Sequence, residues 1–360
     1  MEIIDRKSFF EIEKQMEITP FTQGKGWDNY IGNKSDSLYF VDNYSNPSIC
    51  CRGELYNKPF IGSVLRIQGE AVKQPKQETI QNFYKGIAQI GYSLVLISSL
   101  SPYDIEYEIG IREAGFIRPL HQTTCPLTIL INTLDRPAGH RSWKRNIKKA
   151  IAAKCSFQII SQPTLKDCET FVRIFEEMAT KKQLSYILNK QNIYNLLQDP
   201  DYKLFFVYSA TGSIIAGRII YINGKHAWDV FAANSNESRE NGASYFIIEN
   251  ILNYLSNENI NFFACLQQLA QPDALRLGDG EDRDCLIHKV LVLRRGISPD
   301  GFRGAIGHGG AGLRPPVHND HGNGAMNHAQ AHLLGAWRRI GELCQYHLAL
   351  GVHAVIVILT

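Results

Sequence analysis

The composition of this chain changes abruptly roughly three quarters of the way along, and that change limits where a folded core can form. Of its 16 Tyr and 17 Phe, only Tyr346 and Phe302 lie in residues 264–360. The same segment holds one Lys, Lys289, but eight of the 11 His. Aromatic side chains bury large apolar areas, so a segment nearly without them has little to offset the entropy lost on folding. We therefore expect the functional domains in residues 1–263 and a compositionally foreign, weakly structured tail after them.

The charge balance and the apolar segments exclude several classes of protein. The 38 basic and 35 acidic residues nearly cancel, which argues against a dedicated DNA-binding protein. No segment reaches the roughly 18 apolar residues of a membrane span, and residues 1–15 do not form a signal peptide. The eight Cys form no CxxC pair. We expect a cytoplasmic protein with reduced thiols.

Strand and helix patterns alternate between residues 59 and 263, which predicts an α/β fold. The predicted strands are 59–68, 92–98, 127–131, 157–160, 204–208, 214–222, 226–232 and 260–263. The predicted helices are 77–89, 102–114, 165–183, 190–198 and 242–256. The pair Asn223-Gly224 between two strand patterns is a strong hairpin signal.

Two series of these elements indicate an internal duplication. The segment 60–67 parallels 215–222, and each is followed by further chain, an amphipathic helix and a short apolar strand. We expect a first domain in residues 1–140 and a second, incomplete domain in residues 141–263, each with a mixed sheet and helices on both faces.

The segment 233–243 is the first candidate binding site. It reads as a polar loop leading into a helix, and a helix start offers unpaired N–H groups to an anion such as a phosphate. Small residues at Gly242 and Ala243 would let a ligand approach the backbone, with Arg239 and Asn241 beside it. An ordinary polar loop before a helix would have the same pattern.

The segment 141–154 is the second candidate, because it carries six basic residues and no acidic one. Helical spacing places four apolar residues on one face and four basic ones on the other: Trp143, Ile147, Ala150 and Ile151 against Arg141, Arg145, Lys148 and Lys149. Lys144, Arg145 and Lys148 would meet phosphates of a donor or acceptor. A solvated helix face is the alternative.

Asp229 is the candidate catalytic residue, because it is a charge within an apolar strand pattern. A carboxylate there would act as a base or orient an incoming amine. The alternative is a solvent-facing residue of an alternating strand.

Trp143–Ala150 and Asp229–Gly242, taken with the order of elements, resemble the FemABX family of tandem GNAT-fold acyltransferases over roughly residues 45–263. The resemblance implies transfer of an aminoacyl or acyl group to an amine acceptor, such as a cell-wall precursor peptide or a small amine. It implies no permanently bound cofactor, and a donor that is either aminoacyl-tRNA or acyl-CoA. Ser244 stands where the GNAT pyrophosphate motif has Gly or Ala, so an acyl-CoA donor is not assured.

Two alternatives for the function and three interpretations of the tail stay open. The chain is an acyl-CoA-dependent N-acyltransferase, or a non-catalytic remnant because the end of the second domain is missing. The tail after residue 263 is a frameshifted or joined sequence, a small domain with a helix at 325–350 and a strand at 352–359, or a metal site. The residues of such a metal site would be His318, Asp320, His321, His328 and His332.

Overall fold

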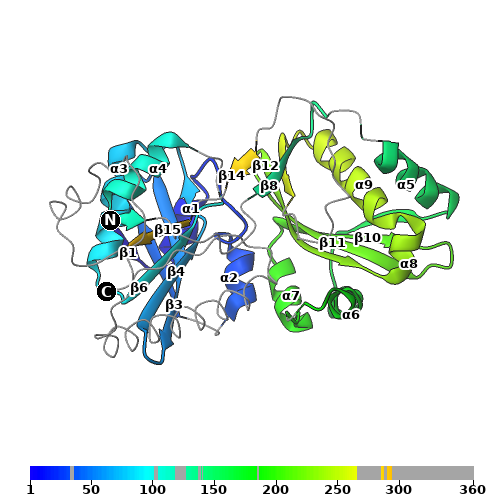
Figure 1. The fold of residues 1–360 in the computed structure, drawn as a ribbon, viewed down its shortest axis with the longest axis horizontal. Helices are drawn as coiled ribbons and strands as arrows, with labels where there is room; N and C mark the ends of the chain where they lie inside the picture. Colours follow the sequence, from blue (N-terminus) through cyan, green and yellow to red (C-terminus); the bar gives the residue numbers. More distant parts are fainter. Residues whose placement is uncertain are drawn as a thin grey trace, which may run out of the picture.

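The computed structural model describes two α/β units that lie side by side (Figure 1). The described residues are 1–32, 36–100, 104–117, 127–136, 139, 141–184, 186–265, 285–287 and 290–293. The predicted metal site and the predicted helix and strand of the tail lie outside these ranges. Within them, no helix combines the length and apolar character that crossing a bilayer requires.

The first unit is built on a mixed sheet with the strand order β1-β2-β3-β4-β6-β15-β7, and β5 pairs with β3. The strands are β1 (Glu2–Ile4), β2 (Asp36–Val41), β3 (Ile49–Lys58), β4 (Gly62–Gln68), β5 (Ala71–Val72), β6 (Leu94–Ser98), β7 (Phe116–Ile117) and β15 (Val290–Leu293). Its helices are α1 (Arg6–Glu13), α2 (Lys25–Ile31), α3 (Gln77–Gln89) and α4 (Ile105–Glu113). α3 and α4 bury their apolar side chains against Leu65, Ile67 and Val95 of one sheet face.

The second unit is built on a sheet with the order β14-β8-β13-β12-β11-β10-β9. The strands are β8 (Leu127–Asn132), β9 (Ser156–Ile160), β10 (Tyr202–Tyr208), β11 (Ile214–Asn223), β12 (His226–Asn234), β13 (Phe262–Cys265) and β14 (Cys285–Ile287). The helices are α5 (Arg141–Ala152), α6 (Leu165–Lys182), α7 (Lys190–Leu197), α8 (Asn236–Asn241) and α9 (Ala243–Asn257). α5, α8 and α9 lie on one face of the sheet and α6 and α7 on the other (Figure 1).

A continuous apolar run in β10 explains why this sheet carries helices on both faces, because successive side chains point to opposite faces. Phe205 and Val207 of β10 pack in the cluster under α9, whereas Leu204 and Phe206 pack under α6 and α7. The Asn223-Gly224 turn joins β11 to β12 as predicted, with Gly224 at a φ of +55°.

The two units repeat one arrangement, but the equivalent strands differ from those predicted. In the first unit β4 leads to α3 and pairs with β6 in parallel, and in the second β12 leads to α9 and pairs with β13 in parallel. The partner of 60–67 in the repeat is therefore β12 rather than 215–222. The prediction was wrong by one strand because a Gly within an apolar strand occurs in both β4 and β11.

Helix α2 forms much of the contact between the units. Trp27 is fully buried and stacks on Phe231 of β12, with ring centroids 6.2 Å apart. The Gly26 N–H donates to Asp199 Oδ2 at 2.6 Å, and the hydroxyls of Tyr30 and Tyr186 are 2.7 Å apart. The Trp27–Phe231 contact joins the first unit to β12, the strand that carries Asp229.

The predicted boundary at residue 140 stays a prediction. β8 precedes that boundary, yet it pairs with β13 in the second sheet. The strands after residue 263 also join the sheets, because β14 pairs with β8, and β15 pairs with β6 and β7. In the described ranges, Cys50, Cys51, Cys155 and Cys168 are free thiols.

Candidate active site

Strand β12 leaves the regular sheet in its second half. Ile220 lies opposite Asp229 and Ile219 lies opposite Phe231, so Val230 is an extra residue that bulges from the ladder. β12 pairs with β13 only from His226 to Trp228. Beyond Trp228, the strand partners that the structure describes for β12 all lie on its β11 side. On the side of β12 that faces away from β11, the backbone N–H and C=O groups from Asp229 onward therefore lie outside the β ladders that the structure describes.

Asp229 is buried, with 4 % of its surface exposed, and it forms an ion pair with Arg218 of β11. The alternative that Asp229 faces solvent is wrong, because its side chain is buried against Arg218. Its role as a base or as an orienting group stays a prediction. The Arg218 guanidinium balances its charge, as burial of a carboxylate requires.

The predicted polar loop 233–243 is mostly helix α8. Ser235 caps this helix by accepting a hydrogen bond from the Ser238 N–H at 3.1 Å. Glu177 of α6 accepts from the Asn236 N–H at 2.8 Å. The Asn236 and Ser238 N–H groups at the start of α8 are therefore bonded to protein oxygen atoms, and the predicted loop is wrong for residues 236–241. The predicted helix start at Gly242 is that of α9, where no side chain caps the helix, and its binding of an anion stays a prediction.

Gly242 and Ala243 lie beneath α5 rather than on an open surface. Gly242 has a φ of +72°, and a Cβ added there would be 2.4 Å from the carbonyl oxygen of Asn146. Ala243 is fully buried. Their assignment to donor binding stays a prediction, and a ligand at Gly242 would require α5 to shift.

Arg239 belongs to a cationic cluster whose other members the sequence analysis did not single out. Burial lowers the pKa of Lys182, and the neighbouring charges of Arg239 and Arg218 lower it further. These three cations thus repel one another, Arg218 is paired with the Asp229 carboxylate, and an anionic ligand would relieve the repulsion. Asn241 donates to Glu237 within α8 at 3.3 Å.

Counting residues outward from the Asn223-Gly224 turn could have found Arg218. Two single charges, Arg218 and Asp229, interrupt the apolar patterns on either side of that turn. Hairpin register places them near each other, on adjacent strands. Lys182 had no such signal, because it ends a helix distant in sequence.

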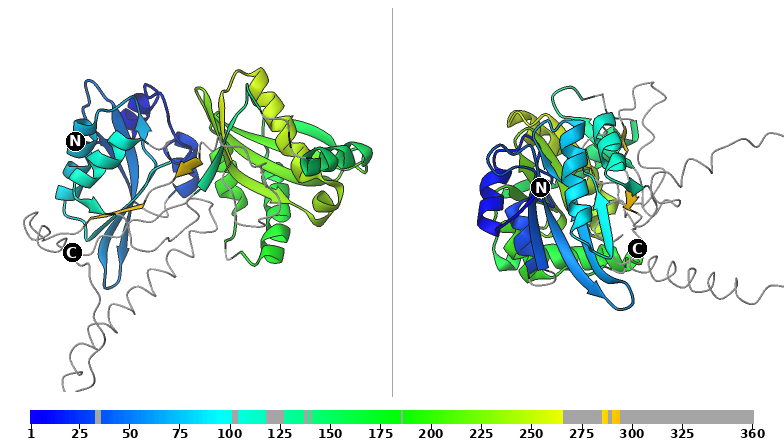
Figure 2. Two further views of the ribbon diagram at one scale, coloured as in Figure 1. Left: turned by 45° about the horizontal axis from the view of Figure 1, so that its top comes forward. Right: turned by 90° about the vertical axis from the view of Figure 1, so that its left-hand side faces the viewer.

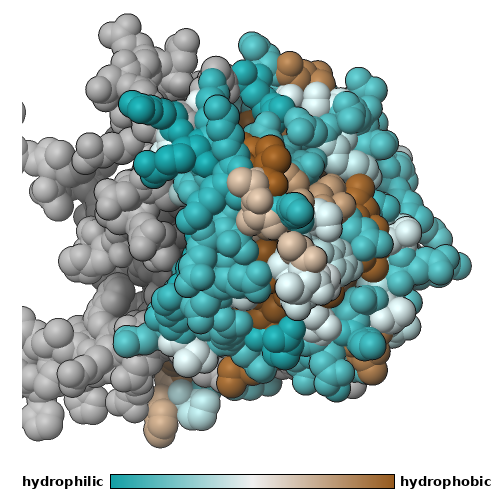
Figure 3. Space-filling view, turned by 90° about the vertical axis from the view of Figure 1, so that its right-hand side faces the viewer, coloured by the Kyte–Doolittle hydropathy of each residue, from teal (hydrophilic) through white to brown (hydrophobic). Residues whose placement is uncertain are grey.

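The predicted basic face of α5 is present. Lys144, Arg145 and Lys148 are exposed, and no ion pair is found for them within the described residues. The surface at this end of the second unit is largely hydrophilic, with small hydrophobic patches (Figure 3). The predicted contact of Lys144, Arg145 and Lys148 with phosphates stays a prediction.

The predicted apolar face of α5 is confirmed only in part. Trp143 packs edge-on against Tyr245 of α9, and its Nε1 donates to Glu249 at 2.9 Å. Ala150 is fully buried, but Ile151 is 60 % exposed. The prediction for Ile151 was wrong, because α5 lies on the outside of α9 and only part of its circumference is covered.

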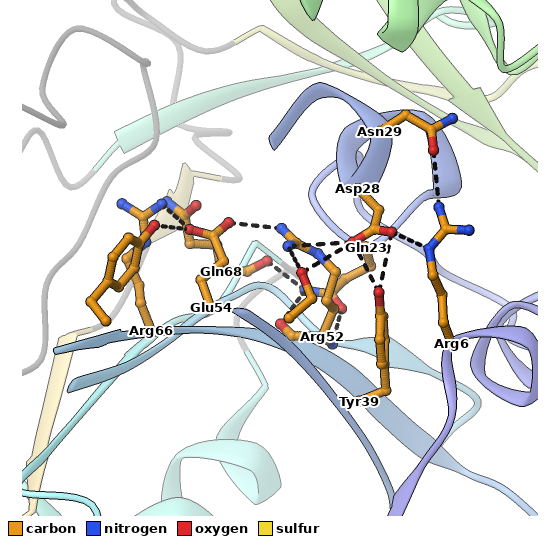
Figure 4. A network of polar contacts seen from close by, with 11 residues as sticks. Arg6, Gln23, Asp28, Asn29, Tyr39, Arg52, Glu54, Arg66 and Gln68 are labelled. Atoms are coloured by element: carbon orange, nitrogen blue, oxygen red, sulfur yellow. Dashed lines mark hydrogen bonds and ion pairs between the residues drawn. The ribbon is translucent and has the colours of Figure 1, made fainter. Parts of the chain in front are cut away.

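A second polar centre, missed from the sequence, lies on the inner face of the first sheet (Figure 4). Arg52 is 2 % exposed and donates to Glu54 Oε1 at 2.7 Å, and Arg66 pairs with the same carboxylate. Burial alone would raise the pKa of Glu54, but the two guanidinium groups outweigh it and lower that pKa to about 2. Asp28 continues the chain of charges, 3.7 Å from Arg52 Nη1.

A pocket of about 660 Å³ adjoins this network between the first unit and α7. Its lining residues are polar almost throughout: Arg6, Asp28, Asn29, Gly32, Asp36, Ser37, Tyr39, Asn195 and Gln198. The Asp28 carboxylate at this pocket is held by Arg6 Nε at 2.6 Å and by the Tyr39 hydroxyl at 3.1 Å. The pocket suits a polar ligand, and none of the predicted site residues lines it.

Solved structures with this arrangement identify the fold. The crystal structure of FemX matches with a TM-score of 0.60 at 10 % identity, over 78 % of this chain and 92 % of FemX. The chain has a FemABX-like tandem GNAT fold. L-PGS from Bacillus licheniformis shares this FemABX-like fold with a TM-score of 0.56 at 12 % identity, over 82 % of this chain and 94 % of L-PGS.

A third structure with the FemABX-like fold is a conserved protein of unknown function from Bacteroides thetaiotaomicron VPI-5482. It matches with a TM-score of 0.54 at 9 % identity, over 80 % of this chain and 95 % of that one. No protein-family model and no curated protein matches the sequence.

Proposed function

We propose that the chain transfers an acyl or aminoacyl group onto an amine acceptor, with a cell-wall precursor peptide or a small amine as the acceptor. The observation that carries this proposal is the second half of β12. There a bulge, a buried carboxylate and backbone groups that lie outside the described β ladders come together in the second unit of a fold shared with FemX.

The chemistry follows from those groups. Backbone N–H groups of β12 beyond Trp228 would hold and polarise the carbonyl of the donor. The amine nitrogen then attacks the carbonyl carbon, the bond to the carrier breaks, and the amine loses a proton. Asp229 would orient the amine and accept that proton, while Arg218 keeps the carboxylate in position.

The positive charge around this site supports a donor with a phosphate-bearing carrier, either aminoacyl-tRNA or acyl-CoA. Lys182, Arg218 and Arg239 form the cationic cluster, and Lys144, Arg145 and Lys148 of α5 extend the positive surface nearby. Because α5 covers Gly242, we expect side chains rather than main-chain amides to hold the phosphates.

Substrate assays test the proposal. The full chain is incubated with charged tRNA and a pentapeptide precursor, or with acetyl-CoA and longer acyl-CoA plus small amines. Asp229→Asn should lower kcat by about 100-fold or more, because the proton acceptor is lost. Absence of turnover with every donor would refute the proposal and favour a non-catalytic remnant.

A matched pair of variants tests donor binding. Arg239→Ala should raise the donor KM about tenfold through loss of a charge-assisted contact. Lys166→Ala removes an exposed cation at the other end of α6 and should leave KM unchanged. Equal KM values for the two variants would remove Arg239 from the site.

A further inference from the structure

The turn between β3 and β4 carries an unusual residue at its tip. Lys58 pairs with Gly62, and the Ile61 N–H donates to the Lys58 carbonyl at 3.2 Å, which leaves Pro59 and Phe60 at the centre of the turn. The hairpin projects from one end of the first unit (Figures 1 and 2). Phe60 is 100 % exposed.

Phe60 also holds a backbone conformation that disfavours its side chain. Its φ is +68°, in the left-handed region where Gly or Asn is favoured in turns. A large apolar side chain is therefore kept where it gains no burial and strains the backbone. Neither the packing of the first unit nor the turn accounts for an aromatic residue there.

Two segments that meet at this end of the first unit carry apolar and cationic side chains. The connection from α3 to β6 lies beside the turn, because the Ser93 N–H donates to Ser63 Oγ at 3.3 Å. Ile90 in that connection is 38 % exposed. The two segments that meet here, 55–63 and 85–93, contain Lys58 and Lys85 but neither Asp nor Glu.

We propose that this tip binds an anionic lipid surface, with the Phe60 ring in the interfacial layer and Lys58 beside the lipid phosphates. The charge of the tip is complementary to anionic headgroups. Its convex shape favours a lipid layer over a protein partner, because one aromatic ring buries about 200 Å², far below the roughly 800 Å² per partner of a specific protein interface. The inference is independent of acyl transfer.

Sedimentation with vesicles tests the inference. The full chain should partition onto vesicles of phosphatidylglycerol and phosphatidylcholine. Phe60→Asn should weaken partitioning at least about tenfold and raise the thermal midpoint by about 2 °C, since Asn fits the positive φ better than Phe. Lys58→Gln should weaken it about fivefold. Ile187→Asn, at a 79 % exposed site in the second unit, should change neither quantity.

A Phe60→Trp variant supplies a direct signal, because its fluorescence should shift to the blue when vesicles are added. Failure of the unaltered chain to partition, or equal partitioning of the Phe60→Asn variant, would overturn the inference. So would a change of oligomeric state in Phe60→Asn with vesicle binding intact, since that result would make a second copy of the chain the occupant.

Discussion

Glu13 gives the contact between the two units a dependence on pH that can be measured. This residue of α1 is 6 % exposed. Burial raises the pKa of its carboxyl from an ordinary 4.5 to about 7, and the charges of Asp201 and Asp199 in the second unit add to the increase. The structure therefore favours the neutral form of Glu13.

The linkage between proton binding and folding gives the direction in which stability changes with pH. The native state holds the Glu13 proton more tightly than the unfolded state, so the contribution to stability is complete below pH 4.5 and is lost as the pH rises through 7. The difference between the two pKa values corresponds to about 3 kcal/mol. Between pH 5 and pH 8 we expect the free energy of unfolding to fall by about 2 kcal/mol from this group.

Urea unfolding of the Glu13→Gln variant isolates the effect. The variant keeps the size of the side chain but cannot ionise. Between pH 5 and pH 8 its free energy of unfolding should therefore fall less than that of the unaltered chain, and the difference should equal the contribution of Glu13. At pH 8 the variant should be the more stable of the two. Tryptophan fluorescence reports the transition, because Trp27 is fully buried beside the contact.

Glu11→Gln is the matched control, since Glu11 is exposed on the same helix. It should leave the pH profile unchanged. Parallel profiles for the unaltered chain and the Glu13→Gln variant would refute the reasoning, because they would mean that Glu13 titrates alike in the folded and unfolded states.

Two substitutions probe the packing that positions the site. Gly26→Ala would place a Cβ 2.6 Å from Tyr202 Cε2 and 2.7 Å from the Leu196 carbonyl oxygen; it should destabilise the chain by about 2 kcal/mol, and an unchanged thermal midpoint would contradict the described contact. Glu54→Gln leaves two buried guanidinium groups without their carboxylate, and it should cost about 3 kcal/mol in urea unfolding; a loss below about 1 kcal/mol would show that the network is solvated.

Local patterns predicted most of the second unit. The predicted helices 165–183, 190–198 and 242–256 agree with α6, α7 and α9 to within a residue, because their apolar faces follow helical spacing. The Asn223-Gly224 hairpin was also confirmed. These elements depend on neighbours within a few positions, which a single sequence displays.

Long-range contacts explain what was missed. Trp27 is buried only because α2 reaches β12, about 200 residues later in the chain. No sequence pattern singled out Arg52, Glu54 and Arg66, and Glu54 can be buried because the two guanidinium groups neutralise it. The cationic cluster needs Lys182, which lies close to Arg239 only in the folded chain.

Strand β8 decides how this protein can be divided for experiments. Because residues 127–132 flank β13, a fragment starting at residue 141 would expose one edge of that strand and would be prone to aggregate. A dissection that begins ahead of residue 127 keeps both neighbours of β13. It would also let the catalytic assays be repeated on the carboxyl-terminal half with its sheet intact at this strand.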